Sequence, residues 1–114
     1  MANRRLLSKS ILYSDDFSTL SADATKLYIY MILEADDDGF IGHTRQVLKI
    51  SEVDGRALEE LIDRGYVIRF KSGVCVVRHW RIHNSIDRNG YTPTEFKIER
   101  SQVYLDNEYV YTLI

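Results

Sequence analysis

Apolar residues between positions 20 and 34 recur at intervals of three and four, the spacing that lines one face of a helix. Either Ser21 or Asp23 is placed to cap the start of this helix. The run Asp36-Asp37-Asp38-Gly39 should end it in a turn, where an aspartate caps backbone donors and the glycine reverses the chain. The members of the apolar pattern are Ala24, Leu27, Tyr28, Met31 and Ile32.

A second helical pattern runs through Val53, Ala57, Leu58, Leu61 and Ile62. Ser51 stands where an N-cap belongs, Asp54 stands three residues on, and Gly65 follows the last apolar turn. Between the two patterns, Phe40-Ile41 predicts a short strand, and Thr44 is expected to cap a brief helix that contains Val47, Leu48 and Ile50.

After Gly65 the pattern changes to two runs rich in β-branched and aromatic residues, 66–70 and 74–80, joined by Lys71-Ser72-Gly73. This arrangement predicts a β-hairpin, because Gly73 can supply the positive φ that such turns need. Helix, short strand, two helices and a hairpin is the order of a winged helix-turn-helix, an α+β fold with a three-helix core and a hairpin wing.

Both ends of the chain predict smaller elements. Leu7, Ile11 and Leu12 are expected on the core face of a short N-terminal helix, and a C-terminal hairpin should turn about 106–108. We therefore expect a winged-helix domain over 1–92 and a C-terminal extension over 93–114 packed on it. A further C-terminal domain is expected to be absent from this chain.

Composition limits the function classes. At 114 residues the chain is long enough for one self-sufficient domain. Its single cysteine, Cys75, suits a reducing compartment. No apolar run approaches the roughly 20 residues of a membrane span. We expect a cytoplasmic protein with no membrane partner.

Net charge is −2, but the charges are unevenly distributed. Residues 14–38 carry seven acids and one base, whereas residues 67–92 carry five bases and one acid. The basic hairpin end and a basic N-terminus are candidate phosphate contacts, with a solvated surface as the alternative. The candidate DNA-binding residues are Arg4, Arg5, Arg56, Arg69, Lys71, Arg78, Arg81 and Arg88.

The charges on the predicted third helix speak against DNA binding through that helix. In DNA-binding winged helices this helix usually lies in the major groove and exposes basic or amide side chains. Here its outward residues are net negative, which indicates either weak duplex binding or contact through other elements. The outward residues are Glu52, Arg56, Glu59, Glu60 and Asp63.

Two constellations resemble metal sites and fail on geometry. Residues 34–41 partly match a calcium loop, but Arg45 occupies the position of the closing glutamate. Cys75, His79 and His83 are four apart, and on a strand such residues lie roughly 13 Å from each other, too far for one zinc ion. Trp80 is expected in the core. With no nucleophile–base pair or phosphate loop, we expect neither enzyme activity nor a cofactor.

Three strings carry a family resemblance: Ala-Asp-Asp-Asp-Gly-Phe at 35–40, His-Trp-Arg-Ile-His-Asn at 79–84 and Tyr-Thr-Pro-Thr at 91–94. Together with Asn3-Arg4-Arg5 and Gly73-Val74, they resemble the N-terminal domain of phage replisome organiser proteins, which belong with DnaD-like primosomal proteins. The resemblance runs over essentially the whole chain. The segment after His-Asn departs from it, since 85–90 holds one base and one acid where the family is basic.

The resemblance implies a winged-helix domain of a phage or prophage replication initiation protein. Such a domain would bind origin DNA, form homo-oligomers and help to recruit the replicative helicase or its loader. Two alternatives stay open: an oligomerisation module without DNA binding of its own, and a winged-helix transcriptional regulator.

Overall fold

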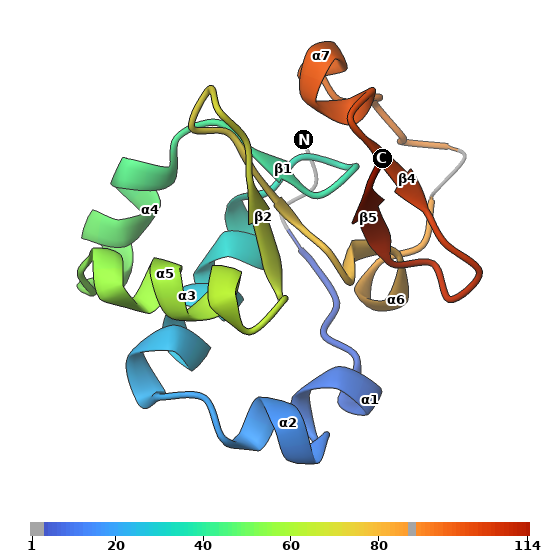
Figure 1. Cartoon of the computed structure of the whole chain (residues 1–114). Coiled ribbons are helices and arrows are strands. Elements are labelled where there is room, and N and C mark those ends of the chain that lie inside the picture. Colours follow the sequence, from blue (N-terminus) through green and yellow to red (C-terminus); the bar gives the residue numbers. More distant parts are fainter. Residues whose placement is uncertain (1–3, 87–88) are drawn as a thin grey trace.

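The long helix α3, Ala22–Glu34, lies at the centre of the computed structural model, which describes residues 4–86 and 89–114 (Figure 1). Ser21 caps it, since its side chain accepts a hydrogen bond from the Ala24 amide at 3.1 Å. Its predicted apolar face is buried against helices α4, Thr44–Ser51, and α5, Gly55–Asp63. The helical pattern that begins the chain's core is therefore confirmed.

Three short strands complete the core: β1, Phe40–Ile41; β2, Val67–Arg69; and β3, Cys75–Val77. They form an antiparallel sheet in the order β1-β3-β2, with Ile41 opposite Cys75 and Val67 opposite Val77. The β2–β3 hairpin turns at Gly73, whose φ is +92°, as the sequence predicted. The fold is thus α+β, in the predicted order of elements.

The start of α5 differs from the prediction. Ser51 is the last residue of α4, and its buried hydroxyl donates to the Val47 carbonyl at 2.7 Å instead of capping the next helix. Asp54 is the true N-cap, accepting a hydrogen bond from the Arg56 amide at 2.9 Å. The prediction that Thr44 caps α4 is also wrong. Thr44 is the first residue of α4, and its hydroxyl has no partner among the described residues.

The second strand of the hairpin is shorter than predicted. After β3 the chain turns into helix α6, Trp80–His83, so the expected strand alternation through Trp80 is wrong. All three residues of β3 are buried, because the sheet is covered on both faces, and alternation gave no guide to where the strand ends. Trp80 is fully buried, as predicted, and its indole donates to the Asp37 carbonyl at 2.9 Å.

Short helices and a second hairpin flank the core. They are α1, Lys9–Leu12; α2, Asp15–Ser18; α7, Lys97–Arg100; β4, Val103–Leu105; and β5, Tyr111–Leu113. The C-terminal hairpin is the predicted one, and Tyr111 joins it to the core by donating its amide to the Arg78 carbonyl at 2.9 Å. Ile11 and Leu12 pack on the core as expected, whereas Leu7 is exposed. In the part of the chain that the structure describes, no helix is both long and apolar enough to cross a membrane.

Candidate nucleic-acid interface

Among the predicted contact residues, Lys71 is the most accessible to a phosphate group. It lies at the exposed tip of the β2–β3 hairpin and makes no ion pair with the described residues. Next to it, the Ser72 hydroxyl donates to the Glu99 carboxylate of α7 at 2.7 Å. The tip therefore presents one free cation, with one carboxylate nearby.

Two other predicted contacts, Arg69 and Arg56, are exposed but paired. Arg69 is bound to Glu59 of α5, and this carboxylate raises the pKa of the guanidinium. Arg56 binds Asp54 at 2.9 Å and thereby lowers the pKa of that carboxyl. Exposed pairs of this kind are weak, typically about 0–1 kcal/mol, so a phosphate could compete for either arginine.

Three predicted contacts point inward, so the prediction that they bind DNA does not fit the structure. The side chains of Arg5 and Arg81 are each 9% exposed and are paired with Asp37 and Asp38. Arg78 donates to the carbonyls of Tyr111 and Gly65, at 2.8 and 3.0 Å. A buried guanidinium with an internal acceptor cannot reach a phosphate without unfolding its surroundings.

The remaining two predicted contacts are Arg4 and Arg88. Arg4 is exposed on the N-terminal segment and precedes Arg5, whose side chain pairs with Asp37 of the acidic turn. Arg88 lies outside the described residues.

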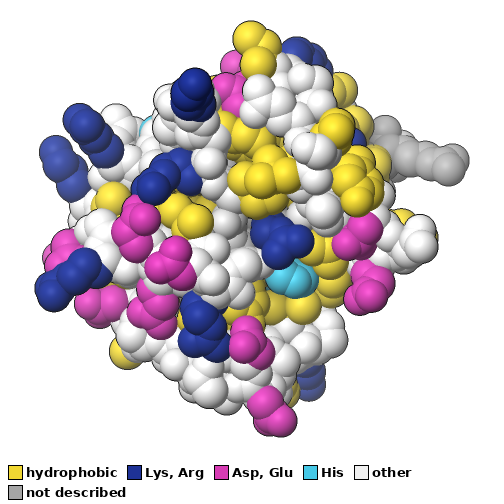
Figure 2. All heavy atoms as spheres, viewed as in Figure 1, with side chains coloured by type: hydrophobic (Ala, Val, Ile, Leu, Met, Phe, Trp, Pro, Cys, Tyr) yellow, Lys and Arg dark blue, Asp and Glu magenta, His cyan; other side chains and the backbone are white. Residues whose placement is uncertain are grey.

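Two exposed cations on α4, Arg45 and Lys49, were not among the contacts predicted from the sequence. They are one helical turn apart, and Thr44–Ser51 contains no acid. The signal was present, because burial of Val47 and Ser51 leaves 45 and 49 on the opposite side of the helix. In Figure 2, Lys and Arg side chains gather over α4 and the hairpin tip, whereas acidic side chains gather over α5 below them.

The three strings that carry the family resemblance meet in one hydrogen-bonded network around the acidic turn. Asp38 is 4% exposed and binds Arg81, the Tyr91 hydroxyl at 2.8 Å and the Thr94 amide at 2.8 Å. Asp36 closes the turn by accepting the Asp38 and Phe40 amides, each at 3.0 Å. The turn is structural, as predicted.

A separate set of hydrogen bonds, made by His83, fastens the N-terminal segment. The Ser8 amide donates to Nδ1 of His83 at 2.8 Å, and Nε2 of His83 lies 2.7 Å from the Tyr28 hydroxyl. Burial, followed by the charge of nearby His79, lowers the pKa of His83 to about 4. Both ring nitrogens are thus used internally. In 4–86 and 89–114, no three His, Cys, Asp or Glu side chains are grouped to hold a metal.

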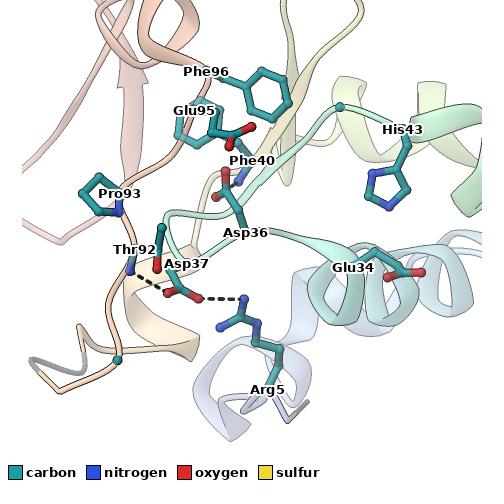
Figure 3. A pocket seen from close by; sticks show the side chains of 12 residues that line it. Arg5, Glu34, Asp36, Asp37, Phe40, His43, Thr92, Pro93, Glu95 and Phe96 are labelled. Atoms are coloured by element: carbon teal, nitrogen blue, oxygen red, sulfur yellow. Dashed lines mark hydrogen bonds and ion pairs between the residues drawn. The ribbon is translucent and has the colours of Figure 1, made fainter. Parts of the chain in front are cut away.

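An open pocket of about 560 Å³ adjoins the acidic turn. Phe40, Phe96 and Pro93 form apolar walls, while Glu34 and Glu95 lie at opposite sides of the opening (Figure 3). Asp37 bridges Arg5 and the Thr92 amide at its edge. Carboxylates at the rim would repel phosphate, so the pocket differs in charge from the surface over α4 and the hairpin tip.

Comparison with known proteins adds no relative. The chain matches no protein-family model, and neither a curated protein nor a solved structure is significantly similar to it.

Proposed function

We propose that this chain is a winged-helix, DNA-contacting domain of a phage or prophage replication initiation protein that helps to recruit the replicative helicase or its loader. The observation that carries the DNA contact is the basic face, defined as Arg45 and Lys49 of α4 with Lys71 of the hairpin tip. It is exposed, without ion pairs among the described residues, and lies on a domain with the element order of a winged helix.

The sheet order supports the winged-helix part of the proposal. Strand β3 lies between β1 and β2, so the short strand after the first core helix pairs with the returning arm of the hairpin. This leaves the hairpin tip as a projecting wing beside the start of α4 (Figure 1). Wings and helices of such domains commonly contact the DNA backbone.

The replication part of the proposal rests on the family resemblance alone. The strings that carry it converge on the acidic turn, where Asp38 and Arg81 hold the C-terminal segment on the core. They are therefore residues that maintain the architecture. The resemblance consequently supports a shared fold more strongly than a shared ligand, and the DNA contact needs its own test.

Binding to duplex DNA of mixed sequence, measured by fluorescence anisotropy at several salt concentrations, tests this proposal. Lys71→Ala should weaken binding equally on all sequences and reduce the slope of log K against log salt by roughly one unit, since one phosphate contact is lost. Lys26→Ala, an exposed lysine on α3, is the matched control and should change little. Absence of binding by the parent chain at low salt would refute the proposal.

A second candidate function, an assembly module, is favoured by the C-terminal hairpin. Tyr104, Tyr109, Leu113 and Ile114 are 48%, 66%, 56% and 85% exposed. A two-stranded hairpin with so much exposed apolar surface is usually covered by a partner or a second copy. Sedimentation at tens of micromolar should then show a homo-oligomer, and deletion of 109–114 should shift it toward monomer. A clean monomer in both cases would leave assembly without support.

A further inference from the structure

The outward face of α4 contains more than cations. Arg45, Gln46, Lys49 and Ile50 are all exposed, whereas Val47 and Ser51 are buried on the opposite side. Ile50 is 53% exposed, and no packing within the described chain accounts for an apolar side chain at that place. The helix thus presents two cations, an amide and an aliphatic group as one continuous surface.

These side-chain types match the exposed edges of base pairs in the major groove. Arginine pairs with two acceptors of guanine, glutamine pairs with an acceptor and a donor of adenine, and aliphatic groups pack on the thymine methyl. We propose that α4 is the groove-entering helix, with Arg45 and Gln46 as the residues that determine sequence preference. This inference rests on the proposed DNA contact and assigns the element that makes it.

Helix α5, which would hold this role in most winged helices, is poorly suited to it. Its Glu59 is engaged by Arg69, and Glu60 accepts the Ser21 hydroxyl at 2.6 Å. Arg56, the one base in Gly55–Asp63, is held by Asp54. Inserting α5 would place carboxylates among phosphates, whereas Thr44–Ser51 brings no carboxylate at all.

The position of α4 relative to the hairpin fits this arrangement. Ile41 pairs with Cys75 at the end of the sheet next to the hairpin tip, and α4 begins three residues later at Thr44. The start of α4 and the tip of the β2–β3 hairpin therefore lie at the same end of the sheet (Figure 1). An α-helix with its side chains is about 10–12 Å in diameter, which a major groove about 12 Å wide admits, and the eight residues of α4 supply about two turns. Lys71 would then hold a flanking phosphate.

Selection from a pool of randomised duplexes, followed by affinity measurement on the enriched and a scrambled duplex, tests the inference. The parent chain should enrich a short motif. Arg45→Ala combined with Gln46→Ala should bind both duplexes alike, because affinity for the motif should fall roughly tenfold or more further than affinity for the scrambled duplex. Lys71→Ala should weaken both duplexes by the same factor, and Lys26→Ala should change neither.

The outcomes separate this inference from the proposed function. No binding by the parent refutes the DNA contact itself. Parent binding without an enriched motif, or a motif preference that survives loss of Arg45 and Gln46, overturns base recognition by α4 while the DNA contact stands. A preference that changes instead with Arg56→Ala assigns recognition to α5. All substituted residues are exposed, so unchanged circular dichroism melting curves will show that the fold is retained.

Discussion

Replacing Asp38 with Asn should test whether the acidic turn holds the C-terminal segment on the core. The substitution keeps the shape of the side chain and removes its charge. Asp38 now accepts hydrogen bonds from Arg81, Tyr91 and Thr94, with only 6% of its side chain exposed. An asparagine offers one acceptor oxygen to these donors and turns its own amide group toward one of them.

The expected loss follows from the burial of both charges. Removing one member of a buried ion pair costs about 3–5 kcal/mol, because the partner is left charged and uncompensated. The Arg81 side chain, 9% exposed, is that partner. Given an m value of ~2 kcal/mol/M, the urea midpoint should fall by about 2 M. Trp80 is fully buried beside the turn, so its fluorescence reports the transition.

Two further variants make the result interpretable. Asp63→Asn changes an exposed carboxylate of α5 and should alter the free energy of unfolding by less than ~0.5 kcal/mol. Arg81→Met in the Asp38→Asn background removes the unpaired cation, and the double-mutant cycle should give a coupling energy of about 1–3 kcal/mol. If Asp38→Asn costs less than ~1 kcal/mol, the pair is not structural, and Arg81 returns to the set of candidate DNA contacts.

Three other perturbations follow from the same contacts. The pKa of His83 is lowered from 6.5 to about 4 in the folded chain, so the stability contributed by the neutral ring is complete above pH 6.5 and is lost as the pH falls toward 4. Urea midpoints between pH 7 and 5 should decline, toward a limiting loss of about 3 kcal/mol at lower pH, and an equal decline in His83→Gln would contradict this origin. Gly39→Ala should destabilise by about 2–4 kcal/mol, since its φ is +92° and a Cβ would lie 2.6 Å from Cγ of Trp80. Gly55→Ala, with open space around it, should stabilise slightly, and similar melting temperatures for the two variants would refute the argument. Millimolar Ca²⁺ should raise the melting temperature no more than a monovalent salt of equal ionic strength, because Asp36, Asp37 and Asp38 already bind internal donors; a saturable rise would show a cation site.

The predictable parts of the fold are those fixed by neighbours in the sequence. The helical period of α3, the Ser21 cap and the glycine turn of the hairpin all depend on residues a few positions apart. The cap of α5 was predicted wrongly because Ser51 and Asp54 both suit the role by type. The choice depends on the Ser51 hydroxyl, which is buried and bonded back to Val47.

The site was harder to predict, because a basic residue does not reveal its acceptor in the sequence. Arg81 and Asp38 are 43 positions apart, and Arg5 reaches an acceptor 30 positions away. Counting charges by segment therefore predicted Arg81 and Arg5 as DNA contacts although both are paired inside the protein. The same counting did not identify Arg45 and Lys49. Their shared surface is recognised only once the buried and exposed sides of α4 are known.

Amide chemical-shift mapping of the ¹⁵N-labelled chain during titration with a short duplex at low salt tests the central claim most directly. If the basic face contacts DNA, the perturbed amides will cluster in 44–50 and 70–74, and the shifts will shrink as salt is added. Perturbations centred on α5 or on the acidic pocket at 90–96, or no perturbation at any salt concentration, would contradict the claim.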